Sequence, residues 1–159
     1  MAVWRLALTR RIGRSFEMLR VAGDAGANKE ITMGQAQPFR RVAVVVEDDD
    51  DERALAAVVL EESELEVVEC CSAEAALAVM QSTRDRVAMV FTDVRLAGMM
   101  DGVELAQVLD AECPDVSVLV TSGNPGDRIG ALPERATYMQ KPWRPLDLLI
   151  AAERARAPG

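Results

Sequence analysis

Short apolar runs alternate with longer segments of helical period along the chain from residue 41 onward. The runs fall at residues 42–46, 65–70, 87–92, 116–121 and 136–140. Two of them, 42–46 and 87–92, are almost continuously apolar, which favours strands that helices cover on both faces. The alternation is typical of parallel βαβ units, so it predicts five strands that pair in parallel.

The segments between these runs are rich in alanine, leucine and glutamate, which favours helices at residues 52–62, 73–81, 103–111 and 146–157. Ser72 and Asp101 precede two of these segments and are predicted to be N-caps. Residues 124–133 contain two prolines and two glycines, so the fourth of five expected helices should be short or mobile. The elements together predict a doubly wound α/β fold, whose ligands bind beyond the carboxyl ends of the strands.

Length and charge narrow the picture further. The 159 residues have the length of one domain with a tail, and the formal net charge is −8. Residues 1–40 carry seven basic and three acidic side chains, whereas residues 41–159 carry eleven and twenty-three. An acidic body repels phosphate backbones, so we expect no direct DNA binding by it. No apolar stretch approaches the roughly 20 residues of a membrane-spanning helix, so we expect a cytoplasmic protein without a transmembrane segment.

The chain contains no histidine, which excludes mechanisms that need a Ser-His or Cys-His pair of its own. Its three cysteines, Cys70, Cys71 and Cys113, lack the spacing of a zinc site and are predicted to be reduced core residues. Any chemistry must therefore come from carboxylates, lysine, hydroxyls or a bound metal.

Polar residues follow the predicted strands where these end. Glu47 and Asp48 follow the first, Asp93 the third and Lys141 the fifth, while Thr121 closes the fourth. Carboxylates gathered at adjacent strand ends repel one another unless a cation lies among them, and hard oxygen ligands favour Mg²⁺. The lysine and the hydroxyl add a side suited to an anion, so the pattern predicts a site for a metal and a phosphoryl-like group, with Asp93 as nucleophile.

Four short segments carry a resemblance to a known family. VVVEDD, FTDVRLAGMMDG, VLVTSGN and YMQKPW resemble the receiver domain of bacterial two-component response regulators, over about residues 41–157. The resemblance implies a flavodoxin-like sheet of order 2-1-3-4-5 flanked by five helices. It also implies a stand-alone response regulator, because no output domain follows in the sequence given. Its partners would then be a histidine kinase or histidine phosphotransfer protein and a downstream protein target.

The resemblance also assigns roles to residues. Asp93 would accept the phosphoryl group and form an aspartyl phosphate, with no outside substrate turned over. Mg²⁺ would be held by Glu47, Asp48, Asp93 and the backbone carbonyl of Arg95.

The remaining roles concern the residues around the phosphoryl group. Lys141 would pair with Asp93 at rest and with the phosphoryl oxygens afterwards. The Lys141–Pro142 bond would be cis, which would direct Lys141 into the site. Thr121 would move to donate a hydrogen bond to the phosphoryl group. Tyr138 matches the family's aromatic that turns inward with it, on a switching face formed by the fourth helix, fifth strand and fifth helix, and Trp143 should lie near the site.

Two departures from the family pattern affect the loop after Asp93. Ala97 stands where a proline is usual, and GMMDG carries one residue more before its glycine. We therefore expect a flexible or bulged loop, with Arg95 as a candidate for controlling the access of hydrolytic water. Two alternatives stay open: a phosphorylation-independent interaction module with the receiver fold, and a hydrolase that uses Asp93 on small phosphate esters.

Six consecutive acids, EDDDDE at residues 47–52, follow the first strand. Beyond the two predicted metal ligands, Asp49 is expected at the margin of the site. Asp50 and Asp51 are expected to begin the next helix, where negative charge complements the helix dipole.

Residues 1–40 form a basic extension that we expect to be flexible or partly helical. Trp4, Leu8, Ile12, Phe16 and Leu19 fall on one helical stripe, which suits a basic amphipathic helix for a membrane surface or a partner. A disordered extension, or translation from Met33, explains the same pattern, and residues 22–40 have the composition of a linker in each case.

Overall fold

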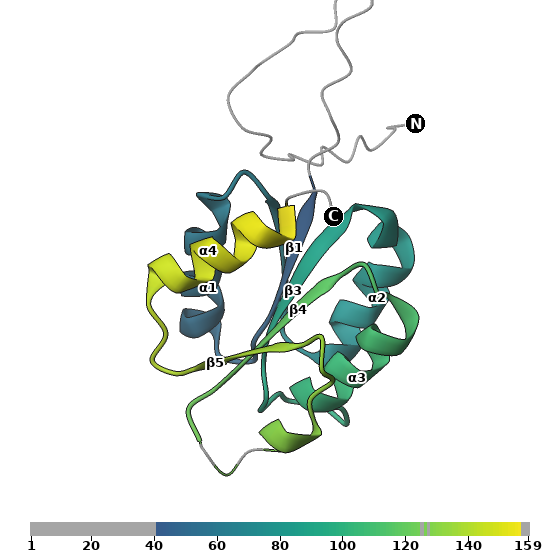
Figure 1. Ribbon diagram of the computed structural model, residues 1–159. Coiled ribbons are helices and arrows are strands. Elements are labelled where there is room, and N and C mark those ends of the chain that lie inside the picture. Colours follow the sequence, from purple (N-terminus) through teal and green to yellow (C-terminus); the bar gives the residue numbers. More distant parts are fainter. Residues whose placement is uncertain (1–40, 125, 127, 157–159) are drawn as a thin grey trace, which may run out of the picture. The chain divides into compact units, whose positions relative to one another are not determined.

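The computed structural model describes residues 41–124, 126 and 128–156, so the predictions for the extension 1–40 lie outside the described residues. Five parallel strands form one sheet in the order β2-β1-β3-β4-β5 (Figure 1), as predicted. Their bounds are β1 Val42–Val46, β2 Glu66–Cys70, β3 Val87–Asp93, β4 Ser117–Ser122 and β5 Thr137–Gln140. All five side chains of β1 are buried, as expected for a central strand whose residues are apolar on both faces.

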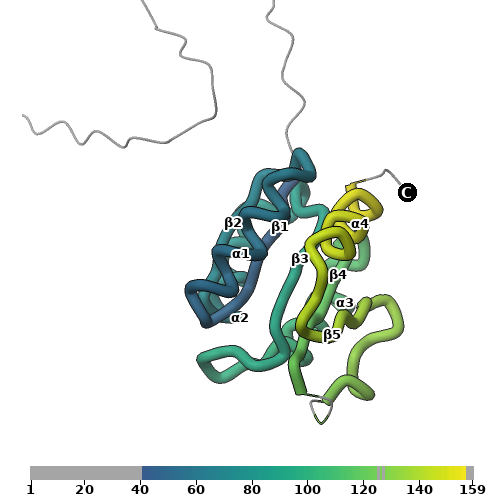
Figure 2. The backbone as a smooth tube through the Cα atoms, turned by 90° about the vertical axis from the view of Figure 1, so that its left-hand side faces the viewer, coloured from purple at the N-terminus to yellow at the C-terminus, as the bar shows by residue number. Residues whose placement is uncertain are grey.

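Four α-helices cover the two faces of the sheet: α1 Asp50–Glu61, α2 Ala73–Thr83, α3 Gly102–Glu112 and α4 Pro145–Arg156. Helices α1 and α4 pack side by side on one face (Figure 2), and α2 and α3 cover the other. Alternate residues of β1 supply the two cores, since Ala43 and Val45 pack toward α1 and α4, whereas Val44 and Val46 pack toward α2 and α3. Burial on both faces fixes the register of the central strands, because a shift by one residue would exchange the two sets.

The helix N-termini are set by acidic and hydroxyl side chains. Ser72 caps α2 and Asp101 caps α3 in a reciprocal capping box with Glu104, as predicted. Asp49, expected at the margin of the site, is instead the N-cap of α1, where its carboxylate accepts the amides of Asp51 and Glu52 at 3.0 Å each. The acid run thus contains a strand end, a cap and the first turn of a helix.

The expected fourth of five helices is absent from the described residues between β4 and β5. Only a 3₁₀ turn, Ile129–Ala131, forms there, so four α-helices are present where five were predicted. Proline lacks the N–H that a helix needs, and glycine loses more backbone entropy on ordering. The connection is held to α3 by polar contacts instead: Gln107 donates to the carbonyl of Ala131 at 2.9 Å, and Arg128 pairs with Asp101 at 2.9 Å.

The three cysteines are free thiols, and they differ in burial. Cys70 and Cys113 are buried as predicted, whereas Cys71 is exposed, because it follows the last residue of β2 and turns toward solvent. Burial raises the pKa of the Cys70 thiol above its ordinary value. Among the described residues, no helix has both the length and the apolar composition to cross a membrane.

Candidate functional site

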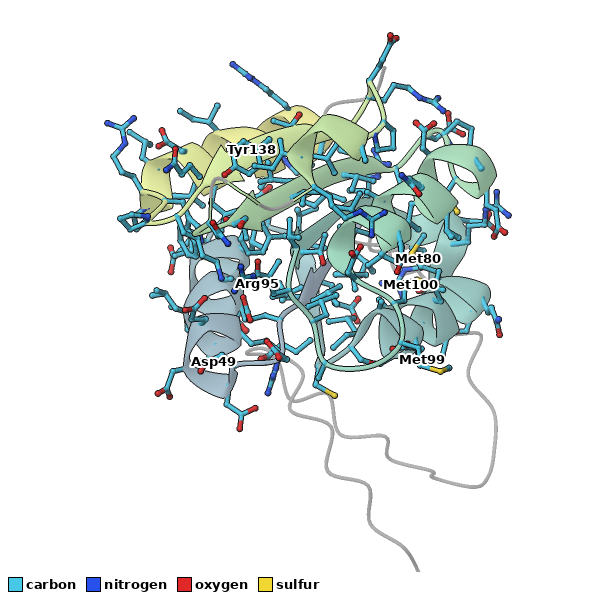
Figure 3. All side chains as sticks on the ribbon, turned by 90° about the horizontal axis from the view of Figure 1, so that it is seen from below. Asp49, Met80, Arg95, Met99, Met100 and Tyr138 are labelled. Atoms are coloured by element: carbon cyan, nitrogen blue, oxygen red, sulfur yellow. The ribbon has the colours of Figure 1, made fainter. Side chains whose placement is uncertain are left out.

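The predicted site residues Glu47, Asp93, Thr121 and Lys141 gather where the parallel strands end. Glu47 directly follows β1, Asp93 is the last residue of β3, and Lys141 directly follows β5. Strand pairing places Asp93 beside Thr121 of β4. Figure 3 looks onto this edge of the sheet, with Asp49, Arg95 and Tyr138 around it.

Lys141 is the centre of the site. Its ammonium donates to Asp93 Oδ2 at 2.7 Å and to Glu47 Oε2 at 3.0 Å, and it also pairs closely with Glu52. The expectation that Lys141 pairs with Asp93 in the resting protein is therefore met in this geometry. Burial alone would lower the pKa of Lys141, but the hydrogen bonds to Asp93, Glu52 and Glu47 outweigh it and raise that pKa. The lysine stays charged throughout the physiological range.

Glu47 is the most deeply buried of these carboxylates, with 3% of its surface exposed. Desolvation raises its pKa from 4.5 to about 7, against the opposing effect of Lys141. Its backbone is held on two sides: its amide donates to the carbonyl of Cys70 at 3.1 Å, and its carbonyl accepts from Arg53 at 2.8 Å. A carboxylate kept this dry gains most from a second cation nearby.

Glu52 belongs to the site although its sequence position predicted only a helix residue. Oxygens of Glu47, Glu52 and Asp93 lie within 4.8 Å of one another, and this is the group of acids that the described residues bring together. Asp48 is exposed and not among the three, so its role as a metal ligand stays a prediction. The sequence did contain a sign that Glu52 belongs to the site: it lies in the first turn of α1, and side chains of that turn lie beside the end of β1.

Thr121 is fully buried at the end of β4. Its hydroxyl is enclosed and makes no hydrogen bond with any residue in the described part of the chain. Buried hydroxyls are normally satisfied, so the unpaired one beside Asp93 is a donor that a ligand at this edge could use. On β5, Met139 lies beside Thr121, and Tyr138 lies one position earlier, opposite Val120, and donates its hydroxyl to the carbonyl of Ser122 at 3.3 Å.

The loop after Asp93 returns tightly to the same strand. The amide of Arg95 donates to Asp93 Oδ1 at 3.3 Å, and the amide of Gly102 donates to the carbonyl of Val94 at 2.9 Å. A Cβ at Gly102 would lie 1.9 Å from the carbonyl oxygen of Asp93, so only glycine fits there. Gly98, inside the longer GMMDG turn, has φ +117°, a conformation that glycine adopts readily.

Trp143 connects the site to the core beneath α4. The Lys141–Pro142 peptide bond is cis, as the resemblance implies. The Trp143 ring meets Phe91 edge-on, with centroids 5.7 Å apart and planes at 85°. Because Phe91 lies two residues before Asp93 on β3, Trp143 contacts the strand that carries Asp93 and lies near the site, whereas a response of its fluorescence to Mg²⁺ stays a prediction.

These residues fit Mg²⁺ and a phosphoryl-like group. Three carboxylates share one ammonium, which leaves an excess of negative charge that a divalent cation with oxygen ligands would neutralise. The lysine and the unpaired threonine hydroxyl supply donors for the oxygens of an anion. Fold and site together define a doubly wound protein whose site lies at the carboxyl ends of the strands.

Comparisons with known proteins agree with this description. The family model of the response regulator receiver domain matches residues 43–153. The fold is similar to a response regulator receiver domain protein from Clostridium thermocellum, at 24% identity and a TM-score of 0.66, over 72% of this chain and 93% of that one. It is also similar to the receiver domain of NtrX from Brucella abortus, at 29% identity and a TM-score of 0.63, over 71% and 96%.

A search of curated proteins returned no match. The family model nevertheless covers most of the chain, and the solved receiver domains share its fold. The chain belongs to the receiver-domain family of response regulators, which are proteins of two-component signalling.

Proposed function

We propose that this chain is a Mg²⁺-dependent phosphoacceptor that receives a phosphoryl group on Asp93 from a histidine kinase or a histidine phosphotransfer protein. The observation that carries the proposal is the position of Lys141, whose ammonium lies 2.7 Å from Asp93 Oδ2 and within reach of two further carboxylates. Phosphoryl transfer needs alignment and neutralised charge more than acid-base chemistry, so the lack of histidine is no obstacle. The donor imidazole belongs to the partner.

In the transfer step, an oxygen of Asp93 forms a bond to phosphorus as the bond from phosphorus to the donor's imidazole nitrogen breaks. Glu47, Asp48, Asp93 and the carbonyl of Arg95 would hold Mg²⁺, which neutralises charge on the phosphoryl oxygens. Lys141 then pairs with the phosphoryl oxygens instead of the Asp93 carboxylate. Glu47 remains in the site as a negatively charged group.

The product state gives Thr121 the partner that it lacks at rest. Its hydroxyl donates to a phosphoryl oxygen, and β4 and the following connection adjust to bring it there. Tyr138 lies on the neighbouring strand and takes up the space that this movement changes. The surface around the β4–β5 connection, β5 and α4 then presents a different face to a downstream protein.

In this proposal the output of the receiver domain is a protein contact that depends on phosphorylation. The domain catalyses its own phosphorylation and dephosphorylation and turns over no other substrate. Hydrolysis of the aspartyl phosphate transfers the phosphoryl group to water and regenerates the carboxylate. The exposed Arg95, two residues after Asp93, lies on the side from which that water arrives.

The test is to incubate the protein with Mg²⁺ and a small acyl-phosphate donor and to measure its intact mass. We expect one added phosphoryl group on the wild type and none on Asp93→Asn. Asp85→Asn, which changes an exposed carboxylate in the 3₁₀ turn before β3, is the matched control and should be phosphorylated normally. A wild type that gains no mass contradicts the proposal, and steady phosphate release from simple esters would favour a hydrolase.

A further inference from the structure

The loop between β3 and α3 is anchored by a carboxylate from a different helix. Glu74, in the first turn of α2, accepts the backbone amides of Met99 at 3.0 Å and Met100 at 3.2 Å through the same oxygen. Figure 3 shows Met99 and Met100 on this loop, with Arg95 at its beginning. One side chain of α2 thus holds the middle of the loop that leaves the proposed phosphoacceptor.

The local backbone is shaped for this contact. Gly98 has φ +117°, which turns the next two amides toward the same side. A Cβ at Gly98 would lie 2.7 Å from Glu74 Oε2, so the carboxylate also occupies the space that a side chain would need. The conformation of the glycine and the position of the carboxylate therefore depend on each other.

Packing also holds the loop, since Leu96 near its start lies partly buried against the core beneath α2 and α3. The Met99 side chain is 96% exposed and adds no packing, whereas Met100 packs only partly against the core beneath α2 and α3. Hydrogen bonds from its own backbone amide and that of Met99 lower the pKa of the Glu74 carboxyl, so it stays ionised at neutral pH. The first turn of α2 adds a favourable dipole for the same charge.

The ends of the loop are fixed to the site itself. The amide of Val94 donates to the carbonyl of Thr121 at 2.9 Å, and Gly102 closes on the Asp93 backbone. Between these points the chain carries Arg95, whose carbonyl is the predicted metal ligand. A hydrogen-bonded midpoint limits how far that carbonyl can move, although the segment is one residue longer than is usual in the receivers that it resembles.

We propose that Glu74 is a positioning residue for metal binding, which acts by holding the loop so that the Arg95 carbonyl faces the acidic group. This inference rests on the proposed function, because it takes the carbonyl to be a Mg²⁺ ligand. Glu74 does not touch the metal or the phosphoryl group. It reduces the number of loop conformations that must be lost when the metal binds.

The experiment uses the full chain, labelled with ¹⁵N, and compares the wild type with Glu74→Ala, Glu74→Gln and the control Glu61→Ala, an exposed acid at the end of α1. Amide exchange is measured without metal, and the Kd for Mg²⁺ is taken from the amide shifts during a MgCl₂ titration. The urea midpoint of each protein reports its global stability.

For Glu74→Ala we expect faster exchange of the Met99 and Met100 amides and a Kd for Mg²⁺ about fivefold weaker, the loss of roughly one net hydrogen bond. Glu74→Gln keeps an acceptor oxygen and should recover most of the affinity. The urea midpoints should match the control, which a merely structural role would not predict.

Unchanged exchange at both amides, or faster exchange with an unchanged Kd, would overturn the inference. A wild type that binds no Mg²⁺ is a different result, because it contradicts the metal in the proposed function, and this inference then fails with it. A wild type that binds Mg²⁺ with an affinity equal to that of Glu74→Ala contradicts only the role of Glu74.

Discussion

The two sides of the site differ in how complete they are at rest. On the β1–β3 side, three carboxylates pair with the ammonium of Lys141, which reaches them from the end of β5, and Glu47 is anchored through its backbone as well as its side chain. On the β4–β5 side, the buried hydroxyl of Thr121 has no partner among the described residues. In the described residues of the connection that follows Thr121, a 3₁₀ turn forms where a helix was expected.

This difference indicates a division of work between the two sides. The β1–β3 side, which we call the rigid side, is preorganised, so little rearrangement is needed when a charged phosphoryl group binds. We call the β4–β5 side the adaptable side. The adaptable side is held to α3 by exposed polar contacts such as the pair between Arg128 and Asp101, and contacts of this kind contribute about 1 kcal/mol or less each. Segments with few buried contacts open and rearrange at low cost. The signal in our proposal therefore begins on the rigid side and is expressed on the adaptable one.

The largest expected effect is that of a methyl group added on the rigid side. In Gly102→Ala the new Cβ would meet the Asp93 carbonyl oxygen at 1.9 Å, and neither is on a flexible side chain. We expect the free energy of unfolding to fall by at least about 3 kcal/mol, because backbone must move. Urea denaturation followed by circular dichroism measures it.

The matched control for this substitution lies on the adaptable side. In Gly130→Ala the new Cβ meets no atom within 4 Å, so the change should leave stability within about 1 kcal/mol of the wild type. Equal losses in the two variants would contradict the difference in rigidity between the two sides.

A second prediction concerns the pH dependence of the rigid side. The pKa of Glu47 is raised from 4.5 to about 7, so the folded state binds a proton more readily than the unfolded state does. The associated stability is fully present below about pH 4.5 and is lost as the pH rises through 7, on the order of 3 kcal/mol. Glu47→Gln cannot ionise, so its stability relative to the wild type should increase over this range.

Unfolding free energies of the two proteins in a metal-free buffer with a chelator, from pH 4.5 to 8, measure this effect. Glu61→Gln, an exposed acid on α1, serves as the control and should differ from the wild type by less than about 0.5 kcal/mol. A difference between Glu47→Gln and the wild type that stays flat or shrinks with rising pH would contradict desolvation as the main cause.

The sequence predicted the rigid side better than the adaptable one, for a physical reason. Apolar runs such as that of β1 define buried strands, and parallel strands end at one edge of the sheet. The sequence alone therefore predicted that Glu47, Asp93 and Lys141 lie close together. Caps such as Ser72 were predictable because their chemistry is local.

Contacts that depend on packing between distant elements could not be predicted in this way. Glu52 and Lys141 are 89 residues apart in the sequence, and Glu74 and Met99 are 25 apart, so each pair meets only through the packing of the folded chain. The segment before β5 shows the same limit: its glycines and prolines predicted a weak helix, but not that its described residues would form a 3₁₀ turn with polar contacts to α3.

The smallest expected change in stability comes from a substitution of Thr121, which tests the adaptable side alone. Thr121→Val keeps the shape of the side chain but removes the unpaired buried hydroxyl, so the resting protein should become more stable, by about 1 kcal/mol. Thr121→Ser keeps the hydroxyl and is the control for the response to phosphorylation. We expect Thr121→Val to be phosphorylated on Asp93 without the change in amide shifts on β5 that the wild type and Thr121→Ser show. A Thr121→Val protein that is less stable than the wild type would show that the hydroxyl already has a partner at rest, and the two sides of the site would then be equally complete.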